Sequence, residues 1–293
     1  MTAPMLWDTF SNRWHFSGVL VARTALHVGA GSDTYDPVET DLPVVRDEQG
    51  NPYIPGSSLK GVIRARLEQL VRAFEPGGPT GPSESWNGKG ACDPLDDRCR
   101  CVSKDRFREI KEEAARAGDP QERWPVRVYE NSCRICRLFG SPWIAGKFNI
   151  ADLRVVSESA ASSEIRDGVS IDRDKGTVKE KYDFEVVTPG SKFVFDAVAE
   201  NLDEGGDRYE PGLILLGLHE LRAGMIRLGG FKSRGLGVVE LRDLKVSRMY
   251  PPTDADKAKT YLDYIMGKET NLLGEAEIQA LIEESLSRLA EGR

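Results

Sequence analysis

The feature that most constrains this fold is a group of five cysteines in a segment with few apolar residues. From residue 75 to residue 142, apolar periodicity gives way to Pro, Gly and mixed charge. Such a segment buries too little apolar surface to fold unaided, whereas bound metal would order it. The cysteines are Cys92, Cys99, Cys101, Cys133 and Cys136.

The cysteine spacing predicts a structural zinc site. Cys133 and Cys136 form a C-x-x-C pair, whose thiolates can reach one tetrahedral ion, and the other cysteines lie about 30 residues upstream. Zinc needs only four thiolates, and the pattern does not say which cysteine is spare. Ordinary buried cysteines are the alternative. A catalytic zinc ion is disfavoured because a closed set of thiolates leaves no position for water.

Composition indicates a globular chain of one large domain or two small ones. The 293 residues are 40% hydrophobic and 30% charged, with a net charge of −7. No apolar run approaches the roughly 20 residues of a membrane span. The first 17 residues show no signal-peptide pattern. We therefore expect a cytoplasmic protein with reduced thiols and no membrane partner.

The periodicity predicts an α+β fold. Strands are expected at residues 16–28, 42–46, 148–157, 191–199 and 238–246, and residues 166–187 form two extended arms around Gly176. Helices are expected from about 56 to 74 and at 104–117, 213–226, 254–267 and 275–291. The core order of strand, helix, strand, strand, helix, strand is typical of a ferredoxin-like or RNA-recognition unit. The apolar face of the first helix is Leu59, Val62, Ile63, Leu67, Leu70, Val71 and Phe74.

Two glycine-rich loops carry no known nucleotide motif. Gly29 and Gly31 begin a G-x-G-x-x-G pattern, but Thr34 stands at its third glycine. The loop at residues 229–237 lacks the lysine of a P-loop, because Leu236 takes that position. Its backbone amides and two cations, Lys232 and Arg234, suit polymer phosphates, and a tight turn before an edge strand is the equal alternative.

Local charge departs from the total. Residues 217–249 carry seven basic and three acidic side chains, and residues 56–72 carry four and one, whereas the tail from 251 carries five and nine. Basic zones thus accompany the glycine loop and the helix start at Pro55, Gly56, Ser57 and Ser58, where we expect an N-cap. This coincidence favours a phosphate-binding groove over a merely solvated helix face.

A carboxylate cluster lies between the first glycine loop and residue 42. It comprises Asp33, Asp36, Glu39 and Asp41, which could activate a ribose 2′-hydroxyl or hold a divalent ion beside a phosphodiester. A polar turn is the simpler interpretation. His27, at the end of the first strand, could face a ligand or be structural.

Several blocks resemble one protein family in order. They are L-H-V-G-A-G at 26–31, D-L-P-V-V at 41–45, Y-I-P-G-S-S-L-K-G at 53–61, L-F-G-S at 138–141, I-D-R at 171–173, G-G at 229–230 and S-R-G-L-G at 233–237. Together they resemble the RAMP superfamily of CRISPR-associated proteins, and most closely the backbone subunit of type III effector complexes.

The resemblance implies a modified RNA-recognition fold that assembles with other effector subunits, including copies or homologues of itself, along CRISPR RNA. A β-hairpin thumb, expected at about 166–187, would splay the guide and target pair at intervals. The acid that opens the D-x-P-V block would cut target RNA with a divalent cation such as magnesium. That residue is Asp41, with Asp36 as the alternative. Family members often carry a zinc-binding insertion before L-F-G.

We expect the chain to divide into an RNA-recognition-like domain, residues 1–250, and a helical tail, residues 251–293. The zinc-binding insertion spans 75–142. A purely architectural guide-binding subunit and a CRISPR RNA processing ribonuclease are the alternatives to a target-cutting subunit. The residues expected to contact RNA are His27, Gly29, Gly31, Ser57, Ser58, Lys60, Arg64, Arg173, Lys175, Lys179, Lys181, Lys232, Ser233 and Arg234.

Overall fold

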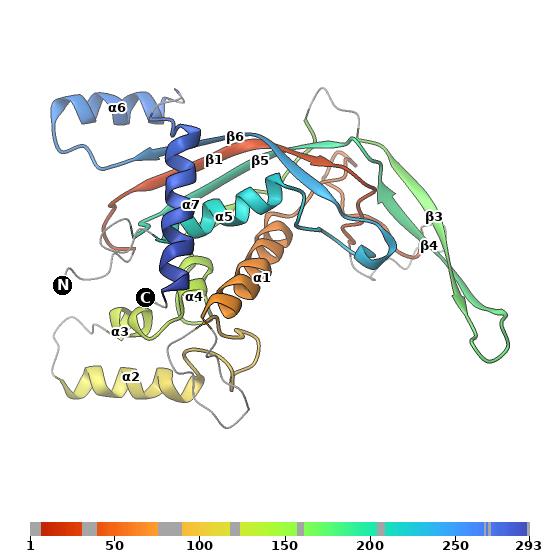
Figure 1. Cartoon of the computed structure of the whole chain (residues 1–293), viewed down its shortest axis with the longest axis horizontal. Coiled ribbons are helices and arrows are strands. Elements are labelled where there is room, and N and C mark those ends of the chain that lie inside the picture. Colours follow the sequence, from red (N-terminus) through yellow and green to blue (C-terminus); the bar gives the residue numbers. More distant parts are fainter. Residues whose placement is uncertain are drawn as a thin grey trace.

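A four-stranded antiparallel sheet with the strand order β2-β5-β1-β6 forms the centre of the molecule (Figure 1). Its strands are β1 (Arg13–Ala22), β2 (Phe148–Ile150), β5 (Lys192–Glu200) and β6 (Val239–Met249). The computed structural model describes residues 7–30, 40–75, 90–117, 124–156, 161–203, 209–266, 268 and 271–291. The predicted α+β class is therefore confirmed.

Helices α1 (Gly56–Phe74) and α5 (Tyr209–Arg222) lie on the same side of this sheet, and α7 (Glu275–Ala290) packs against α5 (Figure 1). Their apolar faces and the inward side chains of the strands form the main core. In α1 the buried side chains recur every four residues, at Leu59, Ile63, Leu67 and Val71. The predicted face of this helix is confirmed at those positions, but Phe74 is exposed at the end of the helix.

Strands β3 (Ser163–Ile171) and β4 (Val178–Val187) form a separate hairpin that projects away from the main sheet (Figure 1). Gly176 makes the turn with a φ of 64°, a conformation that glycine adopts without steric cost. The hairpin falls between β2 and β5 in the chain. It covers the residues for which we predicted two extended arms.

The cysteine-rich segment contains three helices near the C-terminal end of α1 (Figure 1). They are α2 (Lys104–Arg116), α3 (Trp124–Glu130) and α4 (Arg134–Phe139). Only the first of them was predicted from the sequence. After β6, α6 (Ala255–Ile265) precedes α7, as the two helical patterns of the tail predict.

Two predicted strands are largely wrong. Residues 42–46 make only isolated bridges, with Leu42 beside Phe184, Val44 beside Gly29 and Arg46 beside Pro52. Proline has no N–H to donate to a ladder, and Pro43 and Pro52 both lie in this pairing. The strand predicted at 148–157 ends at residue 150 and continues only as bridges.

The helix predicted at 213–226 spans 209–222 instead. Among the described residues, no helix has the length and apolar character needed to cross a bilayer.

Candidate functional sites

Both glycine loops and the segment after residue 40 meet at the base of the hairpin. Leu26 bridges Val187, and Leu42 bridges Phe184, so two distant segments pair with β4. The second glycine loop joins them because the Gly230 amide donates to the His27 carbonyl at 2.8 Å. A small apolar cluster holds this junction together, comprising Ala25, Phe184, Val186 and Leu236 with Leu42, Tyr182 and Phe231 packed against it.

Asp41 is exposed at this junction. Its Oδ2 accepts a hydrogen bond from the Asp183 amide of β4 at 3.0 Å. Asp183 pairs across the hairpin with Asp167, and a hydrogen bond with Asp167, together with the negative charges of Asp167 and Asp41, raises the pKa of Asp183. Three carboxyl groups thus lie near one another. Asp36 and Gly31 lie outside the described residues.

His27 lies beneath the loops and is only 7% exposed. Its Nδ1 is 2.7 Å from the Glu185 carbonyl, and its ring lies 5.1 Å, centroid to centroid, from that of Phe231. A side chain at Gly29 would meet the imidazole at 3.1 Å, so the first glycine loop passes closely over the ring. The geometry gives His27 a packing role at the junction.

Glu185 anchors the segment after Asp41 to the hairpin. Its carboxylate accepts from the Val44 amide at 3.0 Å and pairs with Arg46, which also donates to Ser163. Burial opposes ionisation, but these hydrogen bonds lower the pKa of Glu185. The sequence offers no signal for this role, since it depends on the register of the hairpin.

The second glycine loop presents its cations on a 3-10 turn, Lys232–Arg234, whose three residues are exposed. The Arg234 guanidinium donates to the Tyr182 hydroxyl and lies 5.2 Å from the Phe231 ring centroid. Phe231 has a φ of 55° and Gly235 one of 88°, so the backbone turns sharply on both sides. The hairpin therefore holds the arginine in place through Tyr182, which sequence reasoning missed.

The outer half of the hairpin carries exposed cations and exposed apolar side chains together. The expected RNA contacts Arg173, Lys175, Lys179 and Lys181 are all exposed there. Exposed apolar side chains lie on the same two strands, with Val169, Ile171 and Val178 in the outer half and Ile165 nearer the base. Such a surface can contact both phosphates and bases.

The start of α1 differs from the prediction. Ser57 and Ser58 lie within the first turn, the N-cap is Pro55, and no side chain of the cap residue bonds the helix. Instead the Asp152 carboxylate accepts from the Gly56 amide at 2.9 Å. Burial and the nearby charge of Arg64 lower the pKa of Lys60, which is partly buried.

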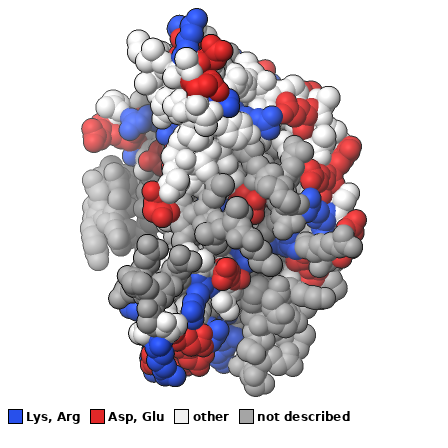
Figure 2. All heavy atoms as spheres, turned by 90° about the vertical axis from the view of Figure 1, so that its left-hand side faces the viewer, with Lys and Arg blue, Asp and Glu red and all other residues white. Residues whose placement is uncertain are grey.

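Most of the basic zone on α1 is engaged within the protein. Arg64 donates to Glu68, to the Gly140 carbonyl and to the Cys136 sulfur. Arg66 pairs with Glu220 of α5. Beside this helix, a groove of about 280 Å³ runs between α1 and residues 225–232, and Arg66, Arg227 and Lys232 contribute to its lining. Figure 2 views the end of the molecule opposite the hairpin, where the described basic and acidic side chains are interspersed.

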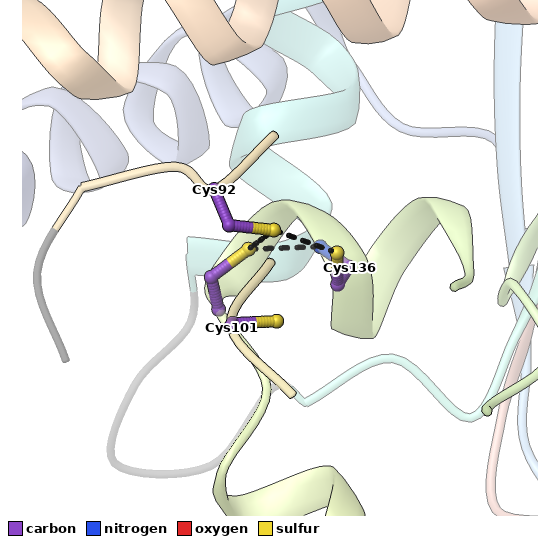
Figure 3. Close-up of side chains that lie close together, drawn as sticks. Cys92, Cys101 and Cys136 are labelled. Carbon is purple, nitrogen blue, oxygen red and sulfur yellow. Dashed lines mark hydrogen bonds between the residues drawn. The ribbon is translucent and has the colours of Figure 1, made fainter. Parts of the chain in front are cut away.

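Four of the five cysteines converge on one buried point. The sulfurs of Cys92, Cys101, Cys133 and Cys136 all lie within 4.8 Å of one another, and the labelled ones point toward a common centre (Figure 3). Cys99 is the spare cysteine, because its Sγ instead contacts Asp96 at 3.8 Å.

The sulfur geometry fits a tetrahedral metal ion. Cys92 Sγ lies 3.4 Å from Cys136 Sγ and 3.7 Å from Cys133 Sγ. Zinc–sulfur bonds of about 2.3 Å place tetrahedral sulfurs about 3.8 Å apart. Hydrogen bonds with the other three sulfurs lower the pKa of Cys133, whereas bonds with Cys101 and Cys133 raise that of Cys136. Four thiolates this close together would need a cation to offset their charge, and this cluster could hold one.

Comparison with known proteins places the chain in a family. Residues 19–240 match the sequence profile of the RAMP superfamily. The chain belongs to the RAMP superfamily. The match spans β1 to the start of β6, so this RAMP protein has both glycine loops, the insertion and the hairpin within the family's region.

Two curated relatives cover most of this RAMP protein. One, from Methanothermobacter thermautotrophicus, is 26% identical over 264 residues, covering 81% of the chain and 86% of the relative. The other, from Methanocaldococcus jannaschii, is 29% identical over 244 residues, covering 81% and 82%. Both relatives are named "CRISPR system Cms endoribonuclease Csm3".

Proposed function

We propose that this protein is a backbone subunit of a type III CRISPR effector complex, which binds CRISPR RNA and cleaves complementary target RNA at regular intervals. Membership of the RAMP superfamily and similarity to two Csm3 endoribonucleases support this function. The observation that carries it is the junction at the hairpin base, where Asp41 is exposed beside two glycine loops and a hairpin whose outer half presents exposed cations. Guide RNA, target RNA and other effector subunits are the partners.

The fold we infer is a modified ferredoxin-like, RNA-recognition fold, in residues 1–250, with the helical tail at 251–293. The sheet order β2-β5-β1-β6 and the chain order β1, α1, β2, β5, α5, β6 support it. In this fold the hairpin at 166–187 acts as the thumb. We also infer a cytoplasmic location, which suits reduced cysteines.

Guide phosphates would contact the exposed turn of Lys232, Ser233 and Arg234, the exposed Gly29 backbone, and the helix start at Ser57, Ser58 and Lys60. Such contacts bind any sequence and weaken with salt. Base pairing between guide and target would supply specificity, as in other guided effectors. The hairpin cations at 173, 175, 179 and 181 would follow the same backbone, while neighbouring apolar side chains enter the stack.

Cleavage would occur beside Asp41. A nucleotide displaced from the duplex can align its 2′-hydroxyl with the scissile phosphate, which helical geometry prevents. Asp41 can accept that proton or hold a divalent cation such as magnesium, and hard cations favour carboxylate oxygens of the kind that Asp41, Asp167 and Asp183 supply. The ion would supply charge stabilisation of the phosphate. Asp36 remains the alternative acid.

The four buried cysteines would bind structural zinc. The sulfur separations and the burial of all four residues support this assignment. Zinc would join the loop that carries Cys92 and Cys101 to the start of α4, and so order the insertion.

The decisive experiment substitutes Asp41→Ala in the complex assembled with guide RNA and its partner subunits. We expect cutting at the regular positions to fall about 10²- to 10⁴-fold, the usual share of a general acid or base, while target binding is retained. Glu48→Ala, another exposed acid of the same segment, is the matched control and should cut normally. Unchanged cleavage by Asp41→Ala would exclude this residue as the catalytic acid. Normal target binding without cleavage in the unaltered complex would favour an architectural subunit.

A further inference from the structure

One face of α1 carries two arginines that bracket a glutamate at four-residue spacing. Arg64 Nε donates to Glu68 Oε1 at 2.8 Å, and Arg72 Nη2 lies 3.6 Å from Glu68 Oε2. Glu68 is 12% exposed, so the acid is largely shielded from water. Because residues four apart share a helix face, the three side chains point the same way.

The other two nitrogens of Arg64 reach one half of the cysteine cluster. Nη2 donates to Cys136 Sγ at 3.4 Å, and Nη1 donates to the Gly140 carbonyl at 2.9 Å. These acceptors lie near the start and at the end of α4. The guanidinium of Arg64 therefore contacts both ends of α4. Cys133 and Cys136 lie at the start of this short helix.

Arg72 reaches the other half of the cluster. Its Nε donates to the Ala91 carbonyl at 2.8 Å, and its Nη2 donates to the Cys92 carbonyl at 2.7 Å. The loop that supplies Cys92 is thus held from the same face of α1, two helical turns beyond Arg64. Glu68 lies between the two arginines and fixes both.

We propose that Arg64 and Arg72 are positioning residues of the cysteine site, which clamp its two ligand-bearing segments to α1. This inference rests on the proposed zinc site. Four thiolates around a divalent ion leave a charge of about −2, which a guanidinium next to a ligand sulfur partly neutralises. Arg64 thereby serves the metal site, although the sequence favoured an RNA contact.

The clamp also connects the cysteine site with the region proposed to meet RNA. A side chain at Gly146 would lie 2.4 Å from the Phe139 carbonyl and 3.0 Å from Lys60 Nζ. One at Gly140 would meet the Gly146 amide at 2.8 Å. Arg64 therefore holds the glycine turn against which Lys60 packs, one helical turn earlier on α1. A bound metal ion would therefore also hold the glycine turn in place beside Lys60.

The test compares metal release from four full-length variants. Each is prepared once with zinc and, separately, once with cobalt(II). They are Arg64→Gln, Arg64→Lys, Arg72→Gln and the control Arg66→Gln. Arg66 pairs with Glu220 on α5 and has no contact with a cysteine among those described, so its loss measures general loosening of α1. Release is followed with a chromogenic chelator, and the thiolate-to-cobalt absorption bands report the ligand environment.

We expect Arg64→Gln to weaken metal binding about 10- to 100-fold, the usual effect of removing a group that supports a ligand. The cobalt bands should shift in Arg64→Gln, because a hydrogen bond to sulfur is lost. Arg64→Lys keeps the charge but cannot reach both acceptors, so its metal release should be intermediate. Arg72→Gln should accelerate release without shifting the bands as far, because Arg72 contacts carbonyls.

Equal release from Arg64→Gln and Arg66→Gln, or wild-type release and bands in Arg64→Gln, would overturn the clamp. Absence of metal uptake by the wild-type protein would overturn the clamp and the zinc site together. None of these outcomes bears on target cleavage at Asp41, which is measured separately.

Discussion

Lys147 carries a buried charge whose removal should measurably destabilise the protein. Its side chain is 2% exposed, and that of its partner Glu210 is 1% exposed, with Nζ and Oε2 2.8 Å apart. The Tyr129 hydroxyl accepts from Lys147 Nζ at 2.8 Å and donates to Glu210 Oε1 at 2.9 Å. Because Tyr129 belongs to α3 and Glu210 to α5, this network joins the cysteine-rich insertion to the main domain.

The substitution Lys147→Met keeps most of the side-chain volume and leaves the Glu210 carboxylate buried without its cation. Breaking a buried pair in this way costs about 3–5 kcal/mol. Glu210 retains the Tyr129 hydroxyl and accepts from the Asp203 amide at 2.6 Å, so the lower end applies. An unfolding entropy of about 2 cal/mol/K per residue converts 3 kcal/mol into a fall in Tm of roughly 5 °C.

Thermal unfolding followed by circular dichroism, with calorimetry, measures this loss. Glu210→Gln should also destabilise, because Lys147 then keeps a buried charge without a carboxylate. The double variant should cost clearly less than the sum of the two, since neither charge remains. A loss below about 1 kcal/mol for Lys147→Met, the size of a single neutral hydrogen bond, would refute the reasoning. Additive single effects would refute it as well.

Three further measurements test the sites. Gly168→Ala places a methyl group 2.3 Å from the Tyr182 ring, which should displace the tyrosine that holds Arg234 and weaken guide RNA binding at low salt, whereas Gly61→Ala, in open space on α1, should bind normally. In an NMR titration the pKa of Asp183 should lie above the ordinary aspartate range and fall in Asp167→Asn, because the neighbouring negative charge is lost and the asparagine amide can donate to the ionised carboxylate; an unchanged value would contradict the pairing. Extraction of metal from the purified protein should expose α2–α4 to proteolysis while β1, β5 and β6 stay protected, and uniform protection would show that the metal does not order the insertion.

Periodicity predicted the elements whose apolar faces are buried against the core. Helix α1 is an example, since its inward residues recur every four positions and its outward ones are charged. Short helices were not predicted because their sequence signals are weak or ambiguous. In α3, Pro125 is the second residue and lies in the first turn, where a proline is tolerated because an N–H there has no partner within the helix; elsewhere in a run a proline usually indicates a break. Helix α4 has only six residues.

The cysteine spacing predicted a metal site but not which four of the five cysteines form it. Cys99 and Cys101 are separated by one residue, and either could be close enough to the C-x-x-C pair in sequence. The choice depends on the local turn, in which the Cys99 amide donates to the Asp96 carbonyl and its sulfur contacts the Asp96 carboxylate. Cys101 is left to face Cys92 and the α4 pair. Such a turn has no periodic sequence pattern from which it could be predicted.

Charge counting located basic segments but could not say where their side chains point. On α1, Arg64 and Arg72 contact the cysteine segments, and Arg66 pairs with α5. In the second basic zone, Arg222 pairs with Glu275 and Arg242 with Glu240. Much of the positive charge is thus already engaged by carboxylates and carbonyls of the protein itself.

The consequence is that RNA affinity should come mainly from the exposed turn at 232–234 and from the hairpin. Both elements present cations next to aromatic or apolar side chains, through Phe231 and Tyr182 in one case and through Ile171 and Val178 in the other. Stacking adds a contribution that salt does not screen, whereas phosphate contacts are lost as salt rises. The same two elements adjoin Asp41, because Tyr182 and Asp183 are consecutive on β4. One short stretch of β4, Tyr182 and Asp183, would therefore support both the RNA-binding turn and the cleavage site.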